Sequence, residues 1–547
     1  MLYRIARLCM IPAIALISSL GIASLVQAQP TLQWSKSLGG SNDDIGYSVS
    51  KTADHGYVVV GLVGSTDGDV HGHLVPGYGG GWIAKLNSDG DTLWTRLIGG
   101  DRAESVVQTA DGGYVVSGNS HSTSIDIWVT KLNSNGETEW TKSFGGSGED
   151  DGRSVIQAKD HGYVIVGATL SIDGDAIGNH GSIDALVIKL DENGNKVWSR
   201  TLGGSYIDEA WSVVETADSG FAIAGDTYSN DGDVPGNHDL THQTSDYWVV
   251  KLNSSGGIVW SKSLGGSGYD QALSIVQATD GGYAVVGQSY SVDGDVHGNH
   301  GGADFWIAKL NQGGDTVWTR SLGGSGSEGA TSIIQATDGN FVVAGYTYSP
   351  TSQTDSGYAA NGDVLANHGM SDYWIVKLSP DGGTLWTKSL GGGSNELAFS
   401  IIQTNDSPDL GYVVAGSGSS GDGDMAGSGF HGIDDFWVVK LSGDKSPSPL
   451  LVSGDRASRP ESYNLSQNYP NPFNPSTVIQ YDIRRAVHVT LRIYDVLGRQ
   501  VGTLVDEERK PGSYESEWDA SQIPSGVYYY RLNAGAVSQT KKMVLMK

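Results

Sequence analysis

The sequence predicts an all-β protein on the basis of its composition and of an internal repeat. Of the 547 residues, 79 are glycine and 38% are hydrophobic, which is typical of many short strands joined by turns. A tryptophan phrase such as WSKSLGG or WTRSLGG recurs seven times between Trp34 and Trp386, at spacings of 60, 46, 58, 62, 58 and 68 residues. Repeats of this length are typical of propellers and solenoids.

One repeat unit, residues 274–324, contains four candidate strands. Their sequences are SIVQ, YAVVG, DFWIAKL and TVWTRSLGG, and the turn signals ATDGG, SVDGDVHGNHGG and NQGGD separate them. The two middle strands are almost continuously apolar, as expected of strands that are buried on both faces. The fourth strand carries a basic residue two positions after its tryptophan in every unit, which protects an outer edge. Four strands of this kind predict a propeller blade.

The number of strands indicates how the ring closes. The first three strands occur seven times, beginning near Ser48, Ser105, Ser154, Ser212, Ser274, Ser332 and Ser400. The fourth strand follows only six of them, and its missing copy, LQWSKSLGG at residues 32–40, precedes the first blade. We therefore predict a seven-bladed β-propeller that is closed by an N-terminal strand.

Residues 1–28 have the pattern of a secretory signal peptide, with Arg4 and Arg7, an apolar stretch and a small-residue cleavage site that ends at Ala28. Cleavage there removes Cys9, the only cysteine, so we expect no disulfide and no cysteine nucleophile in the mature chain. The predicted domains are the signal peptide at 1–28, the propeller at 29–443, a linker at 444–461 and a C-terminal domain at 462–547.

The C-terminal segment has a pattern of its own. Alternating strands with Gly and Asp turns, from NYPNPFNPSTVIQYDI to KKMVLMK, predict a small β-sandwich. The NPFNPST opening, the IYDVLGR and SGVYYYRL strands and the basic end closely resemble the C-terminal sorting domain of the type IX secretion system, an immunoglobulin-like module. This resemblance implies a partner, the type IX secretion machinery, and a secreted protein that is extracellular or associated with the outer-membrane surface.

The repeats also resemble those of other secreted bacterial proteins, through phrases such as SVDGDVHGNHGGADFW. Related repeats are sometimes labelled endoglucanase-like. The net charge of -27 disfavours nucleic acid and anionic lipid as partners. The mature chain has no further apolar run of membrane-spanning length, and we expect a monomer.

Acidic residues gather in loops that are expected to share one face of the propeller. An acid stands four residues before the serine that opens each blade, and the loop between the second and third strands carries acids on both sides of a glycine. The first set is Asp44, Asp101, Asp150, Asp208, Asp270, Glu328 and Glu396. The second set is Asp67, Asp69, Asp173, Asp175, Asp231, Asp233, Asp293, Asp295, Asp363, Asp422 and Asp424.

Two interpretations of the second set stay open. Carboxylates two residues apart, with an asparagine nearby, are oxygen ligands of the kind that bind Ca²⁺, while the neighbouring histidines would suit zinc better. Alternatively, Asp-Gly-Asp is turn chemistry, in which aspartates bond backbone amides, and we favour this reading. The first set is expected to tie strand ends together. With Tyr78 and Tyr358 of two irregular loops, it is also the candidate ligand face.

No catalytic residue is singled out, because the carboxylates repeat blade by blade and GxSxG, HExxH and phosphate-loop motifs are absent. We expect a non-catalytic binding or adhesion scaffold for an extracellular glycan or protein, with calcium as the one candidate cofactor. Two alternatives are a polysaccharide-degrading glycoside hydrolase, which is endoglucanase-like, and a structural surface-layer component. A deep, asymmetric cleft with two isolated carboxylates would favour the enzyme.

Overall fold

The structure is a computed structural model that describes residues 29–71, 79–121, 124–350, 363–364, 366–404, 410–444, 464–465, 468, 475–510, 512–521, 523–535 and 537–545. The predicted signal peptide, Tyr78, Tyr358 and almost all of the predicted linker lie outside the described residues. The chain divides into two compact units, Met1–Ser446 and Pro447–Lys547.

The described part of the first unit consists of four-stranded sheets, numbered here in chain order. Sheets 1 to 3 are β2 (Asp44–Lys51), β3 (Tyr57–Val63), β4 (Gly80–Leu86) and β5 (Thr92–Leu97); β6 (Arg102–Gln108), β7 (Tyr114–His121), β8 (Ile125–Leu132) and β9 (Thr138–Phe144); and β10 (Asp150–Gln157), β11 (Tyr163–Thr169), β12 (Asp184–Leu190) and β13 (Lys196–Leu202). Sheets 4 and 5 are β14 (Asp208–Glu215), β15 (Phe221–Thr227), β16 (Asp246–Leu252) and β17 (Ile258–Leu264); and β18 (Asp270–Gln277), β19 (Tyr283–Ser289), β20 (Asp304–Leu310) and β21 (Thr316–Leu322).

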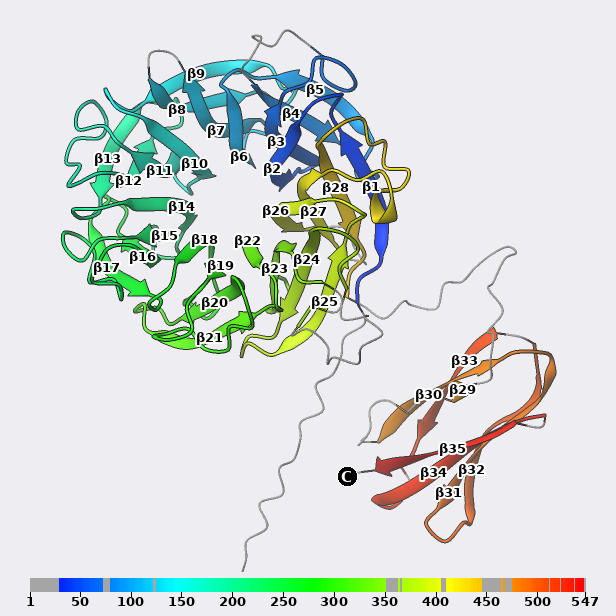
Figure 1. The fold of residues 1–547 in the computed structure, drawn as a ribbon. Coiled ribbons are helices and arrows are strands. Elements are labelled where there is room, and N and C mark those ends of the chain that lie inside the picture. Colours follow the sequence, from blue (N-terminus) through cyan, green and yellow to red (C-terminus); the bar gives the residue numbers. More distant parts are fainter. Residues whose placement is uncertain are drawn as a thin grey trace, which may run out of the picture. The chain divides into compact units, whose positions relative to one another are not determined.

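Sheet 6 is β22 (Glu328–Gln335), β23 (Phe341–Thr347), β24 (Asp372–Leu378) and β25 (Thr384–Leu390). Sheet 7 combines β26 (Glu396–Gln403), β27 (Tyr412–Gly418) and β28 (Asp435–Leu441) with β1 (Leu32–Leu38). The sheets stand side by side in a ring as propeller blades, with the first strand of each repeat nearest the axis and the fourth on the outside (Figure 1). The only helix among the described residues is the short η1 (Gly423–Met425), and none there has the length and hydropathy to cross a bilayer.

The N-terminal strand completes the last sheet, as the strand count predicts. β1 pairs antiparallel with β28, and Ser35 stands opposite Val439 and Leu38 opposite Phe436. The indole Nε1 of Trp437 also donates to Ser35 Oγ at 2.8 Å. The first and last parts of the ring are therefore joined by a full strand pairing.

The core lies in the middle strands and between neighbouring sheets. Every residue of β11 and β12 is buried, whereas the outer strand β13 is exposed over its first half. The repeated tryptophans lie on the outer strands, and six of the seven cover a turn of the next sheet. A Cβ on Gly136, whose φ is +78°, would come within 2.6 Å of the Trp94 ring, so this turn needs a glycine. The tryptophan repeat thus has a packing role.

In six sheets, a buried lysine of the third strand pairs with an aspartate of the turn that joins the first and second strands. The pairs are Lys85 with Asp54, Lys131 with Asp111, Lys189 with Asp160, Lys251 with Asp218, Lys309 with Asp280 and Lys377 with Asp338, at 2.6 to 3.1 Å. These pairs show that much of the repeated charge serves the framework.

The second unit contains two sheets. The first is β29 (Asn464–Leu465), β30 (Ser476–Ile483) and β33 (Gly512–Asp519), and the second is β32 (Gln500–Arg509), β31 (Val487–Asp495), β34 (Gly526–Ala534) and β35 (Val537–Leu545). Side chains of both sheets, including Ile479, Tyr481, Leu491 and Tyr530, form one buried apolar cluster. Alternation of inward apolar and outward polar residues along β34 and β35 produces this core.

Candidate ligand site

The acids that open the innermost strands are buried structural groups in six of the seven four-stranded sheets that the structure describes in this unit. Asp208, which is fully buried, accepts hydrogen bonds from Gly204 N at 2.6 Å, from Ser229 Oγ at 2.8 Å and from the Thr227 hydroxyl. The equivalent carboxyls accept the equivalent glycine amide: Asp44, Asp150, Asp270, Glu328 and Glu396. All six are fully buried, which does not suit the ligand face that we expected, and their hydrogen bonds join the start of the first strand to the linker and to the end of the second strand.

The aspartates of the Asp-Gly-Asp loops bond backbone amides of the linker that enters the same sheet. Asp231 accepts from Ser205 N at 2.7 Å, and Asp233 accepts from Gly203 N at 3.4 Å. The same pattern recurs at Asp67, Asp69, Asp173, Asp175, Asp293, Asp295, Asp422 and Asp424. The glycine of the loop has a positive φ, +66° at Gly232, as a turn requires, but the bonded amides lie 26 to 33 residues earlier in the chain. These aspartates therefore join two loops, whereas the turn chemistry that we favoured bonds amides two residues on.

The same loops were the candidate calcium sites. Among the described residues, no three His, Cys, Asp or Glu side chains are arranged to hold a metal ion. Calcium binding therefore stays a prediction, and the melting temperature with and without millimolar Ca²⁺ tests it.

A second buried aspartate, at the start of the third strand, pairs with a histidine at five junctions between sheets. Asp184 Oδ2 accepts from the backbone N of His180 at 2.7 Å and lies 3.0 Å from His180 Nδ1. The other pairs are His238 with Asp246, His300 with Asp304, His368 with Asp372 and His431 with Asp435. The histidines that we considered for zinc thus bond a carboxylate. We call the five places that contain such a His–Asp pair the regular junctions.

The second oxygen of each of these aspartates is buried without a hydrogen-bond partner. This holds for Oδ1 of Asp184, Asp246, Asp304, Asp372 and Asp435. A buried carboxylate without donors is less stable when ionised. Burial raises the pKa of Asp184, Asp304 and Asp435 to about 6.

Sheet 2 departs from this pattern. Between Gly100 and Asp101 the linker has three residues fewer than between Gly204 and Asp208, so the side chain of Asp101 is partly exposed. In the third strand of sheet 2, Asp126 accepts from Ser124 Oγ at 2.9 Å, and no histidine among the described side chains pairs with it. The regular arrangement is therefore interrupted on both sides of sheet 2.

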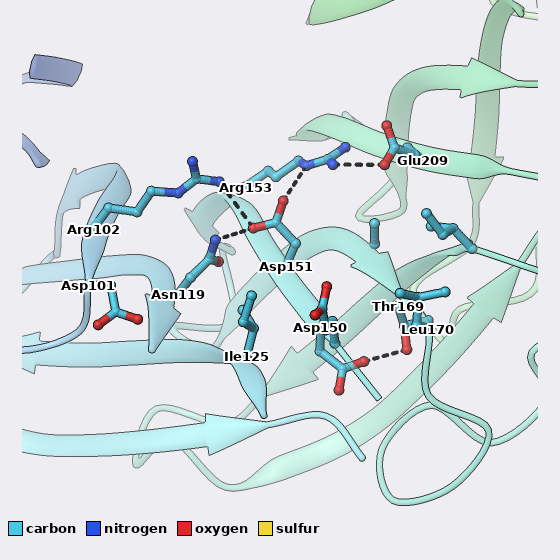
Figure 2. Close-up of a pocket in the computed structure, with 13 residues that line it drawn as sticks. Asp101, Arg102, Asn119, Ile125, Asp150, Asp151, Arg153, Thr169, Leu170 and Glu209 are labelled. Atoms are coloured by element: carbon cyan, nitrogen blue, oxygen red, sulfur yellow. Dashed lines mark hydrogen bonds and ion pairs between the residues drawn. The ribbon is translucent and has the colours of Figure 1, made fainter. Parts of the chain in front are cut away.

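A pocket of about 390 Å³ lies at this interruption. Its wall contains Asp101, Arg102, Asn119, Ile125, Glu149, Asp150, Asp151, Arg153, Ala168, Thr169, Leu170, Ile183 and Glu209, from sheets 2 to 4. Most of the charged side chains come from the innermost strands β6, β10 and β14, and Asp101 and Glu149 come from the linkers before β6 and β10. Figure 2 shows Arg102, Asp151, Arg153 and Glu209 on these strands. This volume is in the range of small-molecule sites.

The polar side of the pocket is one connected network, visible in Figure 2. Asp151 Oδ1 accepts from Arg102 Nη2 at 3.4 Å and from the Asn119 amide, and its Oδ2 accepts from Arg153 Nε at 3.0 Å. Arg153 Nη2 donates to Glu209 at 2.9 Å. Both guanidinium groups are thus fixed by carboxylates.

An aromatic ring and two further acids support this network. The Arg153 guanidinium lies 3.5 Å from the centroid of the Trp211 ring, a cation–π arrangement. Burial raises the pKa of Glu104, which lies 2.5 Å from Arg102 Nε, to about 7. Burial also raises the pKa of Asp226 to about 7, and the nearby Glu209 adds to the rise.

The pKa of Asp151 is shifted in the opposite direction to those of Glu104 and Asp226. Although burial acts against it, the Arg153 and Arg102 guanidinium groups lower the pKa of Asp151. The pocket therefore offers ionised acceptors beside fixed N–H donors, which suits a ligand whose groups both donate and accept hydrogen bonds.

The sequence analysis did not predict the pocket residues because it considered only the positions at which every repeat carries a similar residue. At the positions of Arg102, Asp151 and Glu209, the other sheets carry Ile45, Gln271, Gly329 and Leu397. This position carries a charged residue in three neighbouring repeats and in no other repeat. That difference is the sequence signal that indicates the pocket.

Comparison with known proteins assigns the tail and gives distant likenesses for the ring. Residues 467–546 match the family described as secretion system C-terminal sorting domain. The regulatory protein FlaEY of Caulobacter vibrioides is 26% identical over 239 residues, which are 42% of this chain and 24% of that protein. The chain thus spans about a quarter of the length of this relative.

Similar solved structures include the Dos1 propeller, with 9% identity, a TM-score of 0.37 and coverage of 75% of this chain and 95% of that one. Another is PorZ, a surface component of the type IX secretion system of Porphyromonas gingivalis, with 12% identity, a TM-score of 0.22 and coverage of 92% and 81%. Likenesses at this level assign neither a ligand nor an activity to this chain.

The ring of four-stranded sheets and the sorting domain together define the class, an exported propeller protein. The sorting domain indicates export through the type IX system to the cell surface or the extracellular space. The implied partner is the secretion machinery.

Proposed function

We propose that this chain is a non-catalytic binding protein that holds a glycan in the pocket of sheets 2 to 4 on a monomeric, seven-bladed propeller. The proposal includes an immunoglobulin-like fold for the tail. The observation that carries the proposal of glycan binding is the position of the pocket. The pocket lies where the repeat is interrupted and where charged side chains replace the residues of the other sheets.

The charge balance of the pocket supports a neutral, hydroxyl-rich ligand. Arg102 and Arg153 are paired with Asp151 and Glu209, so an anion finds no unpaired guanidinium in this network, and the remaining acids of the wall disfavour an anion further. A sugar hydroxyl can donate to a carboxylate and accept from a guanidinium at once. The apolar side chains Ile125, Leu170 and Ile183 of the pocket wall suit the C–H face of a sugar ring.

Binding of the full chain to an array of neutral, uronic-acid and sulfated saccharides tests this proposal. We expect neutral saccharides to bind, and Asp151→Asn to weaken binding by at least about tenfold, because the two guanidinium groups lose their shared acceptor. The matched control is Asp91→Asn, which removes an exposed pair with Lys36 on another part of the ring. Equal binding by Asp151→Asn and the unaltered chain would contradict the proposal.

A polysaccharide-degrading enzyme is a second candidate. Glu104 and Asp151 contact the same guanidinium group of Arg102, and the pKa of Glu104 is raised to about 7 while that of Asp151 is lowered. Acid and base carboxyls of glycosidases are separated in this way. We favour binding alone because both groups are engaged by arginine. Release of reducing sugar ends that Glu104→Gln abolishes would establish the enzyme instead.

A further inference from the structure

We propose that an arc of tyrosines extends the pocket, so that the site takes a neutral oligosaccharide of several sugar units rather than a single sugar. This inference rests on the proposed function and adds sugar positions over sheets 4 to 6 to the pocket of sheets 2 to 4.

The arc consists of residues at one repeat position. Leu170, Tyr228, Tyr290 and Tyr348 each follow the second strand of their sheet. The backbone N–H of each donates to a carbonyl of the linker that enters the sheet, at 2.8 to 2.9 Å, with Glu149, Ile207, Tyr269 and Ser327 as acceptors. The same bond places all four residues alike in neighbouring sheets, so they follow the ring around its axis.

The arc begins at the pocket. Leu170 is part of the pocket wall. Burial raises the pKa of Tyr228, and the charges of Asp226 and of Glu209, which lines the pocket, add to the rise. The arc and the polar network therefore adjoin each other at sheet 4.

Two further rings widen the arc. Tyr269 lies against Tyr290, with 6.2 Å between ring centroids, and Tyr346 lies against Tyr348 at 5.8 Å. Room for Tyr346 comes from Gly329 of the innermost strand, where a Cβ would come within 2.5 Å of the tyrosine hydroxyl. In sheets 7 and 1 the same repeat position holds Ser419 and Gly64, so the aromatic arc ends after sheet 6.

The outer rings of the arc are open to solvent. Tyr290 is 49% exposed and Tyr348 is 42% exposed. Tyrosine combines a broad apolar face with a polar hydroxyl and few rotatable bonds, which suits stacking on a sugar ring at low entropic cost. The acidic chain, with a net charge of -27, disfavours polyanionic saccharides, so the expected occupant is neutral.

The test is the dependence of affinity on chain length. Neutral oligosaccharides of one to six units, of the type that binds on the array, are titrated into the full chain by calorimetry. Each additional stacked ring is expected to strengthen binding about 3- to 10-fold until the arc is filled. The double variant Tyr290→Ala/Tyr348→Ala should bind the short sugars as the unaltered chain does and lose this increase.

Tyr529→Ala, which removes an exposed tyrosine of the sorting domain, is the matched control and should retain the increase. A double variant that still shows the full increase with chain length would overturn the arc while leaving the pocket in place. Affinity that does not grow beyond one sugar would do the same. Absence of saccharide binding would overturn both the arc and the proposed function.

Discussion

The five regular junctions and the interrupted sector around sheet 2 differ in what their carboxylates do. At the regular junctions, each aspartate is buried and bonds a histidine of the loop that precedes its own strand. Around sheet 2 the short linker and the missing His–Asp pair leave a pocket lined by charged side chains. In this chain, the residues that recur in every repeat stabilise the ring, and the residues that differ from the repeat are available for a ligand.

The strongest way to break the regular part is to remove its closing strand. Deletion of residues 32–38 exposes the edge of β28 and should lower the free energy of unfolding by about 5 kcal/mol or more, comparable with the whole stability of many domains. Thermal unfolding followed by circular dichroism measures this. Removal of the sorting domain is the control and should leave the ring transition in place, and an unchanged melting temperature after deletion of β1 would refute closure.

A matched pair of substitutions compares the two regions directly. Asp208→Ala leaves an amide and two hydroxyl donors without their acceptor and should cost about 3 to 5 kcal/mol. Asp101→Ala, at the equivalent position of the interrupted sector, should cost less than about 1 kcal/mol because this side chain is partly exposed. Urea unfolding measures both, and equal losses would show that the two positions have the same role.

The pH dependence of stability probes the regular junctions. The pKa values of Asp184, Asp304 and Asp435 lie at about 6 in the folded chain against an ordinary value of 3.8, so the folded state binds more protons. Their effect on stability is favourable at low pH and is lost as pH rises from about 4 to about 6. Asp111 and Asp218, whose pKa values are lowered to about 2, act oppositely, and their contribution is lost only below about pH 4.

We therefore expect the free energy of unfolding to be greatest near pH 4 to 5 and smaller above about pH 7. Urea titrations across this range measure it. Asp304→Asn removes one titrating group while keeping the shape, and should flatten the profile. A stability that rises steadily from pH 5 to 8 would contradict these shifts.

The smallest expected effect concerns a turn in the framework. Ser219 has a φ of +62°, whereas the equivalent turns place Gly112, Gly281 and Gly339 at φ of +82° to +84°. Ser219→Gly should therefore stabilise the chain by about 0.5 to 1 kcal/mol, because glycine adopts positive φ without a steric cost. The denaturation midpoint measures it, with Ser255→Gly in the exposed turn after β16 as the control.

The framework was largely predictable from the sequence, and the site was not. Four strands per unit, buried middle strands and the completion of the last sheet by β1 all follow from periodicity that repeats through the chain. Asp208 and its equivalents are buried, so they do not suit a ligand face. The sequence could not show this, because the burial depends on how the linker folds over the carboxyl group. The pocket depends on side chains from three sheets, such as Arg102, Asp151 and Glu209, that are brought together by the packing of neighbouring sheets.

The pairing of β1 with β28 also constrains the order of folding. The hydrogen bond between Trp437 and Ser35 joins positions 402 apart in the sequence. The entropy of closing so long a loop has to be overcome before the contact forms, and contacts of high sequence separation form slowly. In a chain that emerges N-terminus first, β1 waits unpaired until β28 has emerged, so the ring is completed only after every other blade strand is available.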